Sequence, residues 1–315
     1  MRKGVFFSLL LFALPALAGL CLAGRAQVLR VSYNPMPLNL PSIILRRRGY
    51  LEEAAAALGW RVEWVSNLQT GPLMSEAMAA GALDIAAVMG ETSAVVAKAA
   101  GNDLVVVAPY SVAPGAFALV VPATGGATGA AGLAGKRIGL PVGTTAHYLL
   151  ARFLATEGLS LAKLEVVNMA VPDAAAAVAA GRLDGAVLVE PVLSRVLAGG
   201  KVRLLRDGTG LIGGLTVTSV RGELWRGEPA LVRAFLGAVS RAGRYLAEHM
   251  DEAVDEAAGE TGLPPELVRK IAAKYRFLEI PATEMRRELG AVISFLAEQK
   301  LIARRPALAD LVVEP

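Results

Sequence analysis

Residues 79–86 of this chain read AAGALDIA, and residues 179–186 read AAGRLDGA. In both segments an alanine-rich stretch, which favours a helix, runs up to a glycine that can end it. Leu-Asp then leads into an apolar run of the kind that forms a buried strand. Two such segments about 100 residues apart indicate that the chain contains the same structural unit twice.

The match extends upstream of both segments. A strand-like stretch at 29–32 and another at 137–140 are each followed by a proline-containing loop and a helical pattern. A second strand-like stretch follows in each half, at 62–65 and 164–167, before a proline and an alanine-rich helix. Strands that alternate with helices predict a mostly parallel sheet flanked by helices. We therefore predict an α/β protein with two lobes, each built on such a sheet.

The chain continues past the second unit with strand-like stretches at 202–205 and 215–220 and a helical pattern from 228 to 298. This helical tail needs a surface to pack on. The most economical arrangement returns it to the first lobe, so that two strands cross between the lobes. The predicted division is a signal peptide at 1–26, lobe 1 at 27–112, lobe 2 at 113–212, and a return to lobe 1 at 213–315 with the C-terminal helices.

The first 26 residues have the layout of a secretory signal peptide. Residues 2–3 are basic, residues 4–24 carry no charge, and residues 24–26 place small side chains ahead of a cleavage position. An uncleaved membrane anchor is the alternative, because the apolar run is long enough to span a bilayer. Lipid attachment at Cys21 is a further alternative, although Leu20 departs from the small residue that a lipoprotein signal has there. We expect a periplasmic protein.

The remainder of the chain is nearly neutral. Without the three basic residues of the leader, the 32 lysines and arginines become 29, against 28 acidic residues. A preference for an anion must therefore be local. No basic run is interleaved with aromatic residues, so nucleic-acid binding is not predicted, and we expect a monomer.

Residues 136–154, KRIGLPVGTTAHYLLARFL, contain the strand-to-helix joint of the second unit. Gly143 lets a ligand approach the backbone closely, and the hydroxyls of Thr144 and Thr145 lie where the helix begins. The helix dipole adds partial positive charge there, and His147 falls in the first turn. The segment predicts a small anion-binding site. The alternative is an ordinary helix N-terminus that a threonine caps.

Polar residues of both halves fall at the ends of predicted strands. Open parallel sheets bind ligands at the carboxyl ends of their strands, and two such edges that face each other form a cleft that can close by a hinge. The predicted ligand-binding residues are Asn34, Thr70, Glu91, Thr92, Gly143, Thr144, Thr145, His147 and Glu190.

Three segments resemble the periplasmic substrate-binding proteins of ABC importers for sulfonates, taurine and nitrate. They are EAMAAGALD at 76–84, GLPVGTTAHYLL at 139–150 and DGTG at 207–210. The resemblance implies the type II two-lobed periplasmic-binding-protein fold, in which two crossing strands join the lobes. It also implies that the protein binds a small-molecule solute and passes it to an ABC permease. The permease, and through it the ATPase subunit, would be the partners of the protein.

The second segment is similar to the family's Gly-Ser-Ser-Ala-His-Tyr segment, with threonine in place of both serines. The resemblance implies that Thr144, Thr145 and His147 hold an anionic group of the solute. The solute would be a small anion or zwitterion, such as an aliphatic sulfonate, a taurine-like compound or a nitrate-like ion. Glu91 and Glu190 would repel an anion, so they either pair with an amine of a zwitterion or make bonds across the closed cleft.

Catalysis is not predicted. The sequence has no Gly-x-Ser-x-Gly nucleophile elbow and no phosphate-binding loop of the Gly-x-x-x-x-Gly-Lys type. Two histidines about 100 residues apart do not make a metal site, so we expect neither metal nor cofactor. The alternative function is a binding protein or enzyme for a thiamine-pyrimidine precursor or a similar neutral heterocycle. A sensory module that keeps its N-terminal anchor is another.

Overall fold

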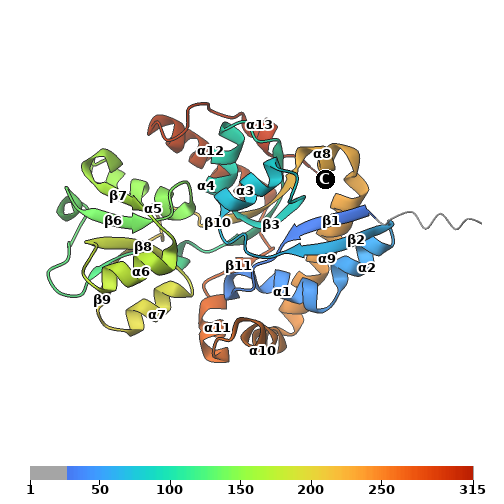
Figure 1. Ribbon diagram of the computed structural model, residues 1–315, viewed down its shortest axis with the longest axis horizontal. Coiled ribbons are helices and arrows are strands. Elements are labelled where there is room, and N and C mark those ends of the chain that lie inside the picture. Colours follow the sequence, from blue (N-terminus) through green and yellow to red (C-terminus); the bar gives the residue numbers. More distant parts are fainter. Residues whose placement is uncertain (1–26, 315) are drawn as a thin grey trace, which may run out of the picture.

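The computed structural model describes residues 27–314. The predicted signal peptide and Cys21 lie outside the described residues. The described chain forms two α/β lobes that lie side by side (Figure 1). We call the six-stranded sheet with its helices lobe 1, and the five-stranded sheet with its helices lobe 2.

Lobe 1 combines elements from the two ends of the described chain. Its strands are β1 (Gln27–Ser32), β2 (Trp60–Val65), β3 (Ile85–Gly90), β4 (Leu104–Val112), β10 (Leu215–Arg221) and β11 (Arg276–Phe277). Its helices are α1 (Leu40–Arg47), α2 (Tyr50–Ala56), α3 (Gly71–Ala79), α4 (Glu91–Ala99), α8 (Gly222–Gly227), α9 (Pro229–Glu248), α10 (Met250–Thr261), α11 (Pro265–Ala272), α12 (Ala282–Glu298) and α13 (Leu308–Leu311).

Lobe 2 is built from the middle of the chain. Its strands are β5 (Phe117–Pro122), β6 (Arg137–Leu140), β7 (Glu165–Asn168), β8 (Gly185–Val189) and β9 (Val202–Asp207). Its helices are α5 (Thr145–Ala155), α6 (Val171–Ala179) and α7 (Val192–Ala198). Short 3₁₀ turns occur at Pro37–Asn39, Pro114–Ala116, Ala131–Leu133 and Leu161–Lys163.

The two sheets share one strand order, which confirms the repeat. The order is β11-β4-β10-β3-β1-β2 in lobe 1 and β9-β5-β8-β6-β7 in lobe 2. β1, β2 and β3 pair in parallel, as do β6, β7 and β8. β10 and β5 hold the same place and run antiparallel to both neighbours. The chain crosses from β4 to β5 and from β9 to β10, so each antiparallel strand is the first that follows a crossing.

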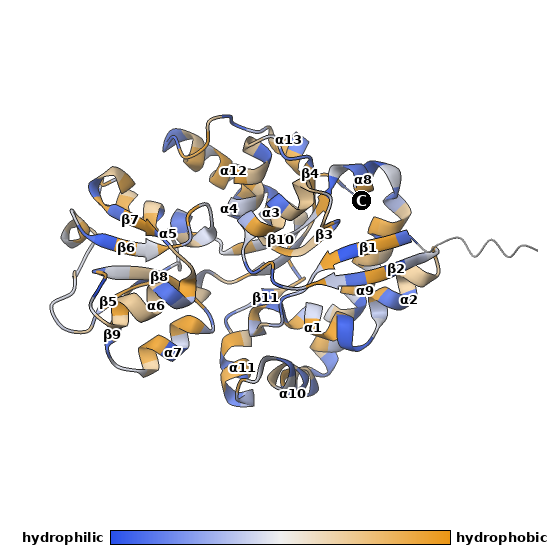
Figure 2. Cartoon of the chain, viewed as in Figure 1, coloured by the Kyte–Doolittle hydropathy of each residue, from blue (hydrophilic) through white to orange (hydrophobic). Residues whose placement is uncertain are grey.

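Side chains of the lobe 1 sheet alternate between two cores. Along β4, Leu104 and Val106 belong to the core under α3, α4 and α12, whereas Val105 and Val107 belong to the core under α1, α2, α9 and α10. This is the alternation that a strand buried on both faces requires. Figure 2 shows the apolar residues along the central strands and on helix faces beside them. The sheet is therefore the middle of three layers.

The AAG-x-LD repeat has one structural role in both lobes. Gly81 and Gly181 end their helices in the left-handed conformation, at φ of 70° and 69°. The backbone N–H of Arg30 in β1 donates to Asp84 Oδ2, and that of Arg137 in β6 donates to Asp184 Oδ2, each at 2.9 Å. Each aspartate thus ties the start of the third strand of a unit to its first strand.

The C-terminal tail departs from the helical pattern that we expected. Arg276 and Phe277 form β11, which pairs with Val112 and Ser111 of β4. β4 is otherwise an edge strand, and its unpaired backbone groups offer hydrogen bonds that a helix at this position would leave unmade. The prediction of a wholly helical tail is therefore wrong at these residues.

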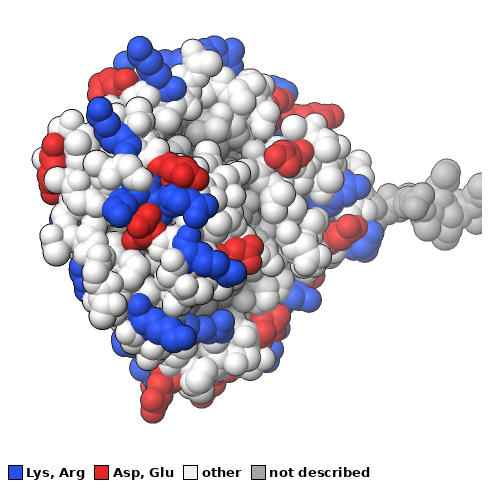
Figure 3. Space-filling model, turned by 60° about the vertical axis from the view of Figure 1, so that its left-hand side comes forward, with Lys and Arg blue, Asp and Glu red and all other residues white. Residues whose placement is uncertain are grey.

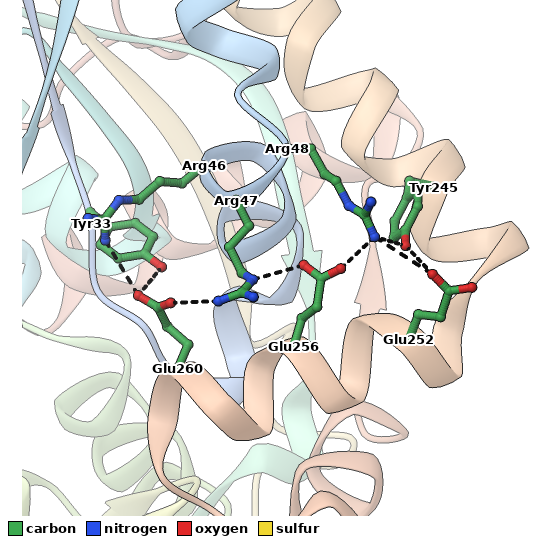
Figure 4. Close-up of polar contacts among 8 residues, drawn as sticks. All are labelled: Tyr33, Arg46, Arg47, Arg48, Tyr245, Glu252, Glu256 and Glu260. Carbon is green, nitrogen blue, oxygen red and sulfur yellow. Dashed lines mark hydrogen bonds and ion pairs between the residues drawn. The ribbon is translucent and has the colours of Figure 1, made fainter.

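A ladder of charges joins α1 to α10 (Figure 4). Glutamates spaced four residues apart share one face of a helix, and here they meet three consecutive arginines at the end of α1. The participants are Arg46, Arg47, Arg48, Glu252, Glu256 and Glu260. Tyr33, just after β1, donates to Glu260 at 3.0 Å, and Arg46 lies 4.3 Å from the centre of its ring. The ladder thereby fixes the segment that leaves β1.

The surface charges are mixed. Figure 3 shows lysines and arginines interspersed with acidic side chains on the face that it presents. A nucleic-acid-binding surface would be expected to gather one sign of charge. Within residues 27–314, no helix combines the length and apolar character needed to cross a membrane.

Replacing the two repeated aspartates tests what they contribute. Asp84 has a side chain only 3% exposed, and it also accepts from Arg221 Nη2 at 2.8 Å. We expect Asp84→Ala to lower the free energy of unfolding by about 3 kcal/mol, because it leaves the partly buried guanidinium of Arg221 with only the exposed Glu223 as its partner. Asp184 makes the same backbone bond but is 40% exposed, so Asp184→Ala should cost about 1 kcal/mol. Urea unfolding measures both, and equal losses would contradict this account.

Candidate ligand-binding site

The lobes are in contact where strand ends of both sheets meet, in a region that we call the lobe boundary. Thr145, the first residue of α5, donates its hydroxyl to Oε2 of Glu91, the first residue of α4, at 3.0 Å. Elsewhere along the boundary, Lys274 after α11 forms an ion pair with Glu190 at the end of β8. Each contact joins a residue of lobe 1 to one of lobe 2. We call this arrangement, with the two lobes in contact, the closed form.

The N-terminus of α5 has no side-chain cap. Thr144 precedes the helix in an extended conformation, but its hydroxyl donates to the carbonyl of Pro141 at 2.7 Å and makes no capping bond. The alternative of a threonine-capped helix is therefore wrong, because the turn after β6 brings a carbonyl within reach of the hydroxyl. The first N–H groups of a helix have no partner inside it, so an anion can accept from them.

Glu91 is a buried acid at the N-terminus of α4. The residue is only 1% exposed, and its Oε1 has no hydrogen-bond partner among the described residues. Burial raises the pKa of Glu91 to about 8, against the opposing effect of the N–H groups of Glu91 and Thr92 and of the Thr145 hydroxyl. Glu288 on α12 raises this pKa further. The acid is therefore mostly protonated at pH 7. The hydroxyl of Thr92 is also buried and has no hydrogen-bond partner within residues 27–314.

Gly143 bonds both to His147 and to lobe 1. The N–H of Gly143 donates to Nδ1 of His147 at 3.4 Å, and its carbonyl accepts from Ser93 Oγ of α4 at 3.0 Å. Gly143 has φ of 77°, which favours glycine. Burial lowers the pKa of His147, so the ring is neutral at pH 7 and carries its hydrogen on Nε2. His147 therefore offers a donor but no positive charge.

A glycine lets α4 and α5 approach each other. A Cβ on Gly90, just before Glu91, would lie 2.9 Å from Thr145 Oγ1, closer than real side chains come. Neither Gly90 nor Ser93 was among the predicted site residues. The signal was present, because both flank Glu91 and Thr92 in the sequence.

Glu190 is held by two lobes at once. The residue is fully buried, and it accepts from the N–H and the hydroxyl of Ser194 at 3.1 and 2.9 Å, in addition to Lys274. The hydroxyl of Tyr275 is buried and finds no hydrogen-bond partner in the described part of the chain, and burial and the nearby charge of Glu190 raise its pKa. Sequence reasoning missed Lys274 because it lies in the tail, outside the repeat. Of the two roles considered for Glu91 and Glu190, bonds across the closed boundary are the one observed.

Asn34 and Thr70 lie on the lobe 1 side only. The carbonyl of Asn34 accepts from Asn39 Nδ2 at 2.7 Å, and Thr70 precedes α3 without a side-chain capping bond. No hydrogen bond within residues 27–314 joins either residue to the others of the predicted set. The structure brings six of that set together at the meeting point of α4 and α5, namely Glu91, Thr92, Gly143, Thr144, Thr145 and His147.

Neither of two hollows on the surface lies at this meeting point. One of ≈ 640 Å³ is lined by α9 and residues 275–280, and one of ≈ 520 Å³ is lined by residues 78–81 and 101–103. Within the described chain, no group of three or more histidines, cysteines or carboxylates is placed to hold a metal ion.

The chain has relatives among curated proteins. An Escherichia coli (strain K12) protein named putative aliphatic sulfonates-binding protein is 32% identical over 151 residues, covering 48% of this chain and 47% of that protein. The chain thus spans about half the length of that relative. A Bacillus subtilis (strain 168) protein of the same name is 27% identical over 276 residues, covering 86% and 82%. The E. coli taurine-binding periplasmic protein is 28% identical over 223 residues, covering 68% and 67%.

Solved structures share the fold. The alkanesulfonate-binding protein SsuA from Xanthomonas axonopodis pv. citri, bound to MOPS, superimposes with a TM-score of 0.80 at 26% identity, covering 91% of this chain and 98% of that one. The periplasmic aliphatic sulphonate binding protein SsuA from Escherichia coli gives 0.76 at 23%, covering 92% of each. The desulfurization enzyme DSZB gives 0.63 at 19%, covering 91% and 96%, which is a likeness of fold alone.

Two α/β lobes that meet at their strand ends, joined by two crossings, make this a protein of the two-lobed periplasmic-binding-protein fold. The family described as NMT1/THI5 like matches residues 46–253. The chain belongs to that family.

The Lys274–Glu190 pair should stabilise the closed form. Lys274→Ala leaves a buried carboxylate without its cation, so closure should become less favourable by on the order of 2 kcal/mol, or about thirtyfold in the ratio of closed to open molecules. Small-angle scattering of the ligand-free protein should then show a larger radius of gyration. The matched control is Lys270→Ala on the exposed side of α11, which should leave the radius unchanged. An unchanged radius in Lys274→Ala would contradict the role of the pair.

Proposed function

We propose that this protein is the extracytoplasmic solute-binding component of an ABC importer. It captures a small anionic or zwitterionic organic solute, an aliphatic sulfonate or a taurine-like compound, between its lobes. It then delivers the solute to a membrane permease, through which it is coupled to the ATPase subunit. The exported form follows from the predicted signal peptide and from the taurine-binding relative, whose name calls it periplasmic.

The observation that carries the proposal is the uncapped N-terminus of α5 facing that of α4 across the lobe boundary. Two helix N-termini that converge place partial positive charge and free N–H groups at one point, which suits an anion. Thr144 and Thr145 add hydroxyl groups at the same place, and a neutral His147 adds a donor. None of these groups carries a full positive charge, so recognition depends on directed hydrogen bonds.

The names of the relatives support the same class of solute. Two are named as sulfonate binders and one as a taurine binder, and the SsuA structure at 26% identity holds MOPS. Because Lys274 already pairs with Glu190, the amine of a zwitterion would have to displace a cation to reach that carboxylate. An aliphatic sulfonate without an amine avoids this competition.

Binding measurements distinguish the candidate solutes. The protein without its first 26 residues should be stabilised in thermal-shift and calorimetric titrations by 1-butanesulfonate or taurine. Nitrate tests the smaller anion that the sequence analysis considered, and the pyrimidine precursor of thiamine tests the neutral alternative. Stabilisation by the pyrimidine and by none of the anions would overturn the proposal.

A double variant tests the site itself. Thr144→Ala with Thr145→Ala should weaken sulfonate binding at least about tenfold, because the anion loses the Thr144 hydroxyl, which would turn to it from the Pro141 carbonyl, and Glu91 loses the Thr145 hydroxyl that holds it. The control is Thr156→Ala at the other end of α5, where a threonine hydroxyl makes a similar bond to a carbonyl at 2.7 Å. The control should keep wild-type affinity. If the double variant loses stability in proportion to affinity, the threonines are structural and the site lies elsewhere.

A further inference from the structure

An acid at the centre of an anion site presents a conflict. Glu91 lies between the N-termini of α4 and α5, where the proposed function places the anionic group of the solute. A charged carboxylate there would repel a sulfonate at close range. The contacts of Glu91 indicate how the conflict is resolved.

The side chain has one satisfied and one unsatisfied oxygen. Oε2 accepts from the Thr145 hydroxyl at 3.0 Å, whereas Oε1 is buried and has no partner among the described residues. Glu91 forms no ion pair within residues 27–314. An ionised carboxylate that is buried and unpaired is costly, and such a group takes up a proton instead. The proton belongs on Oε1, because Oε2 is already an acceptor, and Oε1–H then lacks an acceptor.

The groups around Glu91 on each neighbouring element agree with this assignment. On α4, the N–H groups of Glu91 and Thr92 favour the ionised form but are outweighed by burial. On α12, the carboxylate of Glu288 opposes ionisation. On α5, His147 is neutral, and burial raises the pKa of Tyr148, so that it is uncharged as well.

The cation of α5, Arg152, is used by other groups. Arg152 of α5 donates to the hydroxyl of Tyr148 at 3.2 Å and lies 5.4 Å from the centre of the Phe295 ring on α12. It makes no hydrogen bond or ion pair to Glu91 within the described chain. Of the groups named here, those around Glu91 are uncharged donors and one like charge, Glu288, which pairs with Arg287 of α12 at 3.2 Å.

We propose that Glu91 is a specificity-determining residue that binds the solute as an uncharged acid, with Oε2 held by Thr145 and Oε1–H donated to an oxygen of the anionic group. The proposal rests on the proposed function. It assigns the anion to the α4–α5 meeting point, because an acid proton needs an acceptor and an ammonium group has none to offer. A zwitterion must therefore enter with its sulfonate toward Glu91.

The sign of the pH dependence follows from this role. The pKa of Glu91 is raised to about 8 in the free protein, so the acid is protonated below pH 8 and its charged form accumulates above it. Binding requires the proton, so affinity should be nearly constant well below pH 8 and should fall above about pH 8, approaching tenfold per pH unit. The fold itself should lose stability as the pH rises from about 4.5 through about 8, because the unfolded acid ionises first.

The test is a calorimetric titration of the leaderless protein with 1-butanesulfonate, which stays ionised throughout, between pH 6 and 10. The wild type should show an affinity that is constant at low pH and falls above about pH 8. Titrations at pH 8.5 in buffers of different ionisation enthalpy should show that binding takes up as much as one proton. Glu91→Gln keeps a donor that cannot ionise. It should bind within a few-fold of wild type at pH 7 and lose the fall at high pH.

The neighbouring carboxylate provides a matched variant. Because the charge of Glu288 raises the pKa of Glu91, Glu288→Gln should move the fall in affinity to a lower pH without abolishing binding at pH 6. Affinity that is independent of pH in the wild type, or a fall that persists unchanged in Glu91→Gln, would overturn the inference while leaving the proposed function intact. Failure to bind any sulfonate at any pH would remove both. Proton uptake is measured on the wild type, so the test does not depend on a variant folding.

Discussion

The bond between an aspartate at the start of the third strand and the backbone of the first strand is the constraint on which the rest of the structure depends. It occurs at Asp84 in lobe 1 and at Asp184 in lobe 2, at the same 2.9 Å distance. By fixing the third strand beside the first, it brings the carboxyl ends of parallel strands to one edge of each sheet. Helices that begin at that edge then point their N-termini at the opposite lobe.

The site arises from the way the two edges meet. α4 begins directly after β3, and α5 begins after the short turn that follows β6. Within the described residues, neither helix carries a side-chain cap. Groups that a cap would have used remain available, and the acid that begins α4 bonds to the hydroxyl that begins α5. Burial then decides the charge of that acid. A site with no full positive charge can in this way accommodate an anion beside a carboxyl group.

Much of the fold could be predicted because it follows from local patterns. Glycine and Leu-Asp at matching places in two segments indicate a repeated unit, and apolar runs that alternate with helical patterns indicate parallel sheets. The candidate site was predictable to the same extent, since Glu91, Thr145 and His147 each follow a predicted strand. The alternative of a threonine cap on α5 was wrong, because the competing carbonyl of Pro141 comes from the geometry of a turn. The ion pair of Lys274 with Glu190 could not be predicted, because no pattern near Lys274 in the sequence indicates a contact with Glu190.

The sequence by itself determined the repeat, the parallel strands and the placement of polar residues at strand ends, because these depend on residues close together along the chain. Only the tertiary structure decided which of those residues touch. Glu91 and Thr145 are 54 positions apart, and Glu190 and Lys274 are 84 apart. Tertiary structure also decided the protonation of Glu91, since a pKa depends on burial and on neighbours from other elements. Packing of two lobes supplies those conditions, and no local pattern encodes them.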